Sequence, residues 1–292
     1  MKYLFAFLLA YSLQFYFAEN SYSQTSNPDG ALLWEISGNG LSQPSYLYGT
    51  IHMVCASDFK ISNTLKEKFS SASKIYLELD MDEPGIDMKM LQLSIMKDRK
   101  LNQIFNEKDY AKLNDYFRDS VGMPLTLFQG MKPFVLLSMI SMKAMPCENQ
   151  ESYELNFVKM SKAQHKEMLG LETMEDQIKV FDDMPDSVQV QMVMSAINEV
   201  DEQRVEFAKM TNYYVHQNLD SLYRLIVNSP DIAGSEDALL YNRNRNWIPV
   251  MKNAMKSGPI FFAVGAGHLG GPKGVINLLK AEGFTVKAVA QN

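Results

Sequence analysis

The sequence has no long apolar segment and no block of basic residues. Beyond the N-terminus, none of its 292 residues lies in an apolar stretch of the roughly 18 residues that a membrane helix needs, so no stable membrane span is expected. The 28 Lys and Arg are outnumbered by 34 Asp and Glu, and the net charge of −6 argues against nucleic-acid binding. With 46% hydrophobic and 21% charged residues, the composition is that of a globular chain, which excludes disorder and fibrous repeats.

Three signatures of well-known enzyme classes are also missing. There is no HExxH helix of a zinc protease and no Gly-x-Ser-x-Gly turn of a serine hydrolase. The segment from Gly265 through Gly267 to Gly270 has the spacing of a dinucleotide fingerprint. However, no acidic residue ends the next expected strand, and the further βα units of a Rossmann domain do not follow. We therefore expect no nucleotide cofactor.

Residues 1–23 have the features of a secretory signal peptide. Lys2 precedes an apolar run over residues 4–17 that is too short and too polar for a stable span. A small-x-small pattern at residues 21–23 predicts cleavage before Gln24. We therefore expect residues 24–292 to be exported to the periplasm or secreted, and the alternative is a signal anchor that stays attached.

The chain has only two cysteines, Cys55 and Cys147. Export would place them in an oxidising compartment, where disulfides form and persist. The two residues then either pair or remain as two buried thiols, because the sequence does not define their separation.

Short β-like segments at both ends of the chain enclose a long, mostly helical stretch. Because the last strands need partners from the first half, a single domain over residues 24–292 fits better than two domains. The fold class is therefore α/β, with a central mixed sheet, flanking helices and a large helical insertion at about residues 84–257. Strands are expected at 31–37, 45–51, 74–79, 167–171, 259–264 and 284–290, and the later helices at 152–163, 173–184, 187–228, 237–246 and 271–282.

Two of the four histidines follow predicted strands in the same sequence context. One Gly-x-x-His motif runs from Gly49 to His52 and the other from Gly265 to His268. In open α/β sheets the carboxyl edge of the strands binds ligands, and glycine there allows tight turns and a close backbone approach. We therefore predict a site at His52 and His268 in which Gly49, Gly265 and Gly267 contact the substrate. Each histidine by itself is also compatible with a structural role.

Carboxylates stand at comparable positions. Glu78 lies near the end of the strand expected at 74–79, and Glu172 directly follows the one at 167–171. Two histidines with one or two carboxylates suit a divalent metal ion, and they also suit acid–base chemistry without a metal. For each carboxylate alone, a strand-end or helix N-cap role is the alternative. The remaining histidines, His165 and His216, lie in helical segments and are predicted to be surface residues.

A third polar cluster lies near the end of the helical stretch. Arg243, Asn244 and Trp247 have the spacing of one helix face. An arginine can stabilise an oxyanion or hold a carboxylate through two parallel hydrogen bonds, and Asn244 is placed beside it as a substrate-binding residue. The alternative is a surface helix with ordinary ion pairs.

Methionine is abundant, with 20 residues. Met139, Met142 and Met145 share a predicted helix face. An adaptable core is the first interpretation. A flexible apolar groove for a peptide or lipid-like ligand is the second, and a copper site with thioether ligands is the third.

The ordered set of motifs resembles the TraB/PrgY/GumN family, which includes the Tiki-type metalloproteases. The matching residues run in the family's order over about residues 30–290. They are Tyr48-Gly49-Thr50-Ile51-His52, Glu78, Gly170-Leu171-Glu172-Thr173 with Gln177, Arg243-Asn244-x-x-Trp247, and Val264-Gly265-Ala266-Gly267-His268-Leu269-x-Gly271.

The resemblance implies an α/β fold related to ChaN-like and erythromycin-esterase-like proteins. In Tiki-type members, the polar site of two Gly-x-x-His motifs and a Glu is assigned to metal-dependent peptide cleavage. Carried over to this sequence, His52, His268 and Glu78 become ligands of Mn, Co or Zn, and Glu78 is also catalytic. Arg243 becomes a binder of the substrate or transition state, and Glu172 a supporting carboxylate.

The first hypothesis is therefore an exported metal-dependent peptidase. The alternative is a non-catalytic protein that sequesters a peptide or a small hydrophobic ligand in the Met-rich groove. Binding of haem or a metal ion is a further possibility that the ChaN-like resemblance implies.

Overall fold

The computed structural model describes residues 30–229, 232 and 234–291. The signal peptide predicted at residues 1–23 lies outside the described residues. Within the described ranges, no helix is both long and apolar enough to cross a membrane.

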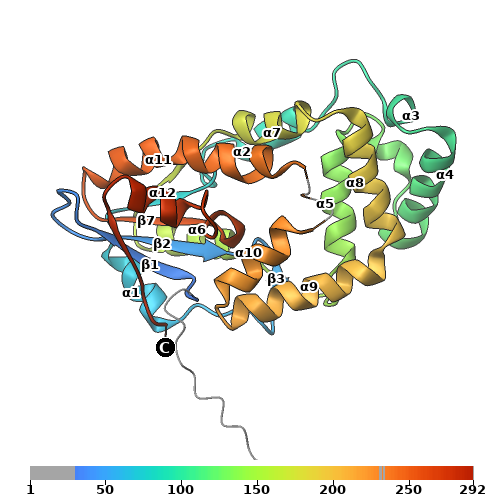
Figure 1. Ribbon diagram of the computed structural model, residues 1–292. Helices are drawn as coiled ribbons and strands as arrows, with labels where there is room; N and C mark the ends of the chain where they lie inside the picture. The colour runs from blue at the N-terminus through green and yellow to red at the C-terminus, as the bar shows by residue number, and fades with distance from the viewer. Residues whose placement is uncertain (1–29, 230–231, 233, 292) are drawn as a thin grey trace, which may run out of the picture.

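A six-stranded mixed sheet forms the centre of the molecule, in the order β6-β4-β7-β2-β1-β8 (Figure 1). The first four strands in this order run parallel, and β1 is antiparallel to both of its neighbours. Strands from both ends of the chain thus share one sheet, and the predicted α/β class with a mixed sheet is confirmed. The strands are β1 (Leu33–Ser37), β2 (Ser45–Thr50), β4 (Lys74–Leu77), β6 (Glu167–Gly170), β7 (Ile260–Gly265) and β8 (Thr285–Ala288).

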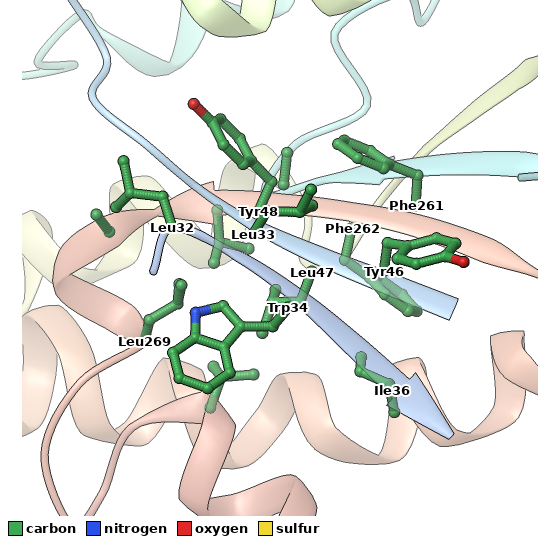
Figure 2. Close-up of a cluster of buried hydrophobic side chains, with 14 of the residues drawn as sticks. Leu32, Leu33, Trp34, Ile36, Tyr46, Leu47, Tyr48, Phe261, Phe262 and Leu269 are labelled. Atoms are coloured by element: carbon green, nitrogen blue, oxygen red, sulfur yellow. The ribbon is translucent and has the colours of Figure 1, made fainter. Parts of the chain in front are cut away.

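Helices cover both faces of the sheet because its central strands are apolar on both sides. On one face, Phe261 of β7 contacts Phe69 and Phe157, with ring centroids 5.2 and 5.4 Å apart. Figure 2 shows Phe262 and Trp34 on the opposite face. The first face is covered by α1 (Asn63–Ser71) and α6 (Tyr153–Ala163), and the second by α11 (Asn242–Met255) and α12 (Val275–Ala281) (Figure 1).

The pairing of β2 with β7 brings the two Gly-x-x-His motifs together. The strands are parallel, and the last registered pair is Thr50 with Gly265. Because both strands end at the same edge, the turns that follow them are neighbours. The second turn continues as the short helix η4 (Ala266–His268).

Part of the helical stretch between β4 and β7 forms a second layer with its own apolar core at one end of the molecule (Figure 1). Strand β6 interrupts this helical stretch and pairs with β4 at the edge of the main sheet. Besides α6 and α11, the helices of this stretch are α2 (Ile86–Leu93), α3 (Leu101–Ile104), α4 (Glu107–Tyr116), α5 (Pro133–Ala144), α7 (Met174–Asp182), α8 (Asp186–Asn198), α9 (Val200–Val215) and α10 (Leu219–Val227), and η3 (Asp237–Tyr241) precedes α11. The second core is built mainly by α3, α4, α5 and α8.

Some helix boundaries differ from the predicted ones. The single helical stretch predicted at 187–228 consists of α8, α9 and α10, because the backbone leaves helical geometry at Glu199 and adopts a left-handed conformation at Gln217. The helix predicted from residue 271 begins at Val275, since Gly271 has a positive φ of 76° that a regular helix does not accommodate.

A small two-stranded sheet lies after the first histidine. It pairs β3 (Val54–Cys55) with β5 (Gln150–Glu151). Cys55 of this sheet lies at disulfide distance from Cys147, with Cα atoms 5.8 Å apart. This placement agrees with the pairing alternative rather than with two separate buried thiols.

Candidate functional site

His52, Glu78 and His268 surround one small space at the carboxyl edge of the sheet. A Cβ atom built at Gly265 would lie 3.3 Å from Glu78 Oε1 and 3.6 Å from both His52 Nε2 and His268 Cδ2. The space is open because residue 265 has no side chain. The fold thus brings these three predicted site residues, which are far apart in the sequence, together around Gly265, a further predicted site residue.

Glu78 directly follows β4 and is buried, with 8% of its surface exposed. Its Oε1 atom accepts a hydrogen bond from the backbone N–H of Gly265 at 2.7 Å, and its Oε2 atom accepts one from Arg243 Nη2 at 2.6 Å. Burial opposes ionisation, but electrostatic interactions with His268, Arg243 and His52 and the hydrogen bond from the Gly265 N–H lower the pKa of Glu78 to about 2. Glu78 is therefore an anion at neutral pH.

His268 is held in one tautomer by Asn244. The Asn244 Nδ2 group donates to the carbonyl oxygens of Lys273 and His268, which leaves its Oδ1 atom 2.6 Å from His268 Nδ1. Nδ1 must therefore carry the hydrogen, and the Nε2 lone pair faces Arg243 Nη1 at 3.2 Å. Burial and the charge of Arg243 lower the pKa of His268 to about 3, so the ring is neutral. Asn244, predicted as a substrate-binding residue, is itself only 1% exposed and positions this ring.

His52 is held from a different element. Its Nδ1 atom lies 3.2 Å from Oε1 of Glu154 on α6, and the same oxygen accepts a 2.7 Å hydrogen bond from Thr50 Oγ1. Burial of the site lowers the pKa of His52, but the hydrogen bond to Glu154 and the nearby carboxylates outweigh it and raise the pKa to about 9. The ring is 71% exposed, so water screens these charges.

Sequence reasoning missed Glu154. A glutamate in the first turn of a helix is ordinary, because it complements the helix dipole there, and nothing in the sequence links it to His52.

Arg243 and Glu172 form a buried ion pair behind Glu78. Arg243 Nε donates to Oε1 and Oε2 of Glu172 at 3.1 and 3.2 Å, and Trp247 Nε1 donates to Oε2 at 3.1 Å. Burial raises the pKa of Glu172, although the hydrogen bond and charge of Arg243 partly offset this effect. The π-helical segment η3 precedes α11 directly, and its Leu239 carbonyl accepts from Arg243 Nη1 at 3.1 Å. The predicted face of Arg243, Asn244 and Trp247 thus points into the site.

A sequence model of the TraB/PrgY/gumN family matches residues 32–288 and therefore spans every residue of this arrangement. The chain belongs to the TraB/PrgY/gumN family. The resemblance seen in the motifs is confirmed. No curated protein and no solved structure matches the chain.

Two of the glycines in this TraB/PrgY/gumN site are required by close packing. A Cβ atom on Gly49 would lie 3.1 Å from Ala266 Cβ, so glycine lets the two Gly-x-x-His turns touch. A Cβ atom on Gly267 would lie 3.1 Å from Ile226 Cδ1 on α10. The other two histidines, His165 and His216, are exposed and lie outside the site.

The donor set suits a divalent ion, but Arg243 competes with it. Two imidazoles and a carboxylate are ligands for Zn, Mn or Co, and each imidazole has the polar partner on Nδ1 that metal-binding histidines usually have. As the side chains stand, no three His, Cys, Asp or Glu of the described residues are arranged to hold an ion. Arg243 Nη1 and Nη2 donate to His268 Nε2 and Glu78 Oε2, so an ion at this place requires the guanidinium to release His268.

Proposed function

We propose that this TraB/PrgY/gumN protein is an exported hydrolase, a metal-dependent peptidase in which His52, His268 and Glu78 hold the ion. The observation that supports the proposal is the space at Gly265, which all three side chains border within 3.6 Å of the missing Cβ. Such convergence at the carboxyl edge of a parallel sheet is typical of an active site.

The environment of each residue determines the role that we assign to it. A divalent ion, when bound, polarises the scissile carbonyl and lowers the pKa of the attacking water. Glu78, whose pKa is lowered to about 2, suits an anionic ligand better than a general base at neutral pH. Asn244 keeps the Nε2 atom of His268 unprotonated, whereas His52, held by Glu154 through Nδ1, must lose its Nε2 proton when an ion binds. Arg243, once it releases His268, supplies a positive charge for the developing oxyanion.

The proposal is tested by peptide turnover. A library of synthetic dodecapeptides is incubated with the protein and Mn²⁺, Co²⁺ or Zn²⁺, and products are identified by mass spectrometry. We expect cleavage that EDTA abolishes and that His52→Ala and His268→Ala each remove. The matched control is His165→Asn, because His165 is exposed and has a φ of 52°, which asparagine tolerates. Equal turnover in His52→Ala and the wild type would exclude this site as the catalyst.

A non-catalytic role in sequestering a peptide or small hydrophobic ligand is the second candidate. The observation that favours it is a cavity of about 940 Å³ beside Met123, Met139 and Met142. Ligand binding that survives both histidine substitutions, with no turnover in any form, would support this role over the first.

Export is part of the proposal and has its own test. The Cys55–Cys147 pair at disulfide distance supports an oxidising compartment. Expression of the full chain in a Gram-negative host should yield a periplasmic protein that begins at Gln24 on N-terminal sequencing. An unprocessed protein in the cytosolic fraction would contradict it.

A further inference from the structure

Two cavities adjoin each other on the helical part of the chain. The first, which we call the helix cavity, encloses about 330 Å³ between α5, α9 and α10, and Leu137, Phe207, Leu225 and Ile226 are among its walls. The second, the methionine cavity, is the 940 Å³ space of Met123, Met139 and Met142. Met145 lines both, so the two cavities meet at this residue.

One wall residue of the helix cavity packs against the turn that carries His268. Ile226 forms part of the cavity wall and also contacts Gly267, where a Cβ atom would lie 3.1 Å from Ile226 Cδ1. Figure 1 shows α10 beside the end of β2, and η4 packs directly on α10. The absence of a side chain at Gly267 therefore leaves room for Ile226 beside the turn of His268.

The methionine cavity is linked to the segment that follows His52. Cys147 lines it, and Cys147 lies at disulfide distance from Cys55, three residues after His52. The linings thus reach the turn of His268 through Ile226 and the segment that follows His52 through Cys147.

The walls favour an apolar occupant. Both volumes are of the size of ligand-binding pockets, about 300–1,000 Å³. Unbranched methionine side chains adapt to differently shaped apolar groups. The charged residues of the two linings carry both signs, with Glu206 and Glu148 against Lys143 and Arg204, so charge does not select an anion or a cation.

We propose that the helix cavity and the methionine cavity are subsites that bind apolar side chains of the peptide on which the site acts. The proposal rests on the proposed peptidase function, and it names the substrate class as peptides rich in Leu, Phe, Met or Ile near the cleaved bond. Two contacts assign the cavities to the substrate rather than to an unrelated ligand: Ile226 packs on Gly267, and Cys147 pairs with Cys55.

The experiment separates binding from turnover. In EDTA, the immobilised full-length mature protein is exposed to the dodecapeptide library, and retained peptides are identified by mass spectrometry. Ser141→Trp fills the helix cavity from its exposed edge, and Met142→Glu charges the methionine cavity, where Met142 is 51% exposed. The matched controls are Val205→Trp and Met88→Glu, at exposed positions that line neither cavity. Thermal unfolding confirms that all four variants fold.

We expect retained peptides to be enriched at least tenfold in Leu, Phe, Met and Ile, and both cavity variants to reduce the enrichment at least fivefold while both controls leave it unchanged. With Mn²⁺ added, the cavity variants should raise KM for apolar peptides without changing kcat. Turnover without apolar preference, unaffected by Ser141→Trp and Met142→Glu, would overturn the subsites and leave the peptidase proposal intact. Apolar enrichment without turnover would support the cavities and refute the peptidase.

Two other occupants give distinct results. If a second copy of the chain occupies the cavities, light scattering of the eluted protein shows a dimer. The cavity variants dissociate this dimer, and peptides are not retained. If they hold a lipid, native mass spectrometry shows a fatty acid bound to the wild type, which the peptide library fails to displace. Either result would overturn the proposal.

Discussion

The Nδ1 atom of His52 lies 3.2 Å from the Oε1 atom of Glu154, a residue 102 positions away on α6. The same oxygen accepts the hydroxyl of Thr50, so one carboxylate oxygen fixes two neighbouring side chains of the first Gly-x-x-His motif. Nδ1 donates to Glu154, and the Nε2 atom of His52 borders the space at Gly265. Through Glu154, helix α6 thus orients His52 at the edge of the sheet.

We expect Glu154→Ala to weaken the site through His52. Loss of a polar partner of a metal-binding histidine typically lowers metal affinity or activity by about 10–100-fold. Isothermal titration with Mn²⁺ and the turnover rate measure the effect, and Glu154→Gln should restore part of it because its amide oxygen can still accept from Nδ1. Glu67→Ala, at an exposed position on α1, is the control. Unchanged Mn²⁺ affinity in Glu154→Ala would show that the contact does not position His52.

Local patterns predicted the sheet edge and most of the site. Strand β7 is an uninterrupted apolar run, and both Gly-x-x-His motifs lie at strand ends. Residues that are adjacent in the sequence are therefore enough to predict these strands and the turns after them. The fold class and the nearness of His52, Glu78 and His268 follow from such patterns. Glu154 could not be predicted because only the packing of α6 against the sheet brings it to His52. The breaks between α8, α9 and α10 were missed because Glu199 and Gln217 are not typical helix breakers, although Asn218, which caps α10, is a typical helix start.

Arg243→Ala is expected to destabilise the fold strongly. The guanidinium is 13% exposed and pairs with Glu78 and Glu172, which are 10% and 7% exposed as side chains. Removing one partner of a buried ion pair leaves uncompensated charge and typically costs about 3–5 kcal/mol. Urea denaturation of the wild type and of each variant measures the change in the free energy of unfolding. Lys252→Ala, on the same helix as Arg243, removes an exposed ion pair with Glu282 at the end of α12 and should cost no more than about 1 kcal/mol. Equal losses in the two variants would contradict the prediction.

Asp80 should make the fold less stable at neutral pH than at mildly acidic pH. Burial, together with the hydrogen bond and charge of Asp82, raises the pKa of Asp80 from 3.8 to about 6. The folded state binds the Asp80 proton more tightly than the unfolded state does. The stability gained from this proton is therefore fully present below about pH 4 and is lost as the pH rises through 6.

Asp80→Asn removes this dependence. Its Tm should exceed that of the wild type at pH 7.5, and the difference should shrink at pH 4. Calorimetric scans at both pH values measure it, with the exposed Asp98→Asn as control. A Tm difference that is the same at both pH values would mean that Asp80 does not titrate as described.

Gly265→Ala should disable the site without unfolding the protein. Gly265 has a φ of −52°, which alanine adopts without strain, so the backbone does not oppose the change. The new methyl group would lie 3.3 Å from Glu78 Oε1 and 3.6 Å from His52 Nε2, in the space that the three site residues share. We expect Mn²⁺ affinity and turnover to fall at least as far as in Glu154→Ala, with a Tm close to that of the wild type. Gly130→Ala adds the same group where nothing lies within 4 Å and should change neither property. Full activity in a folded Gly265→Ala protein would place the chemistry elsewhere, because a methyl group and a reacting carbonyl cannot occupy the same space.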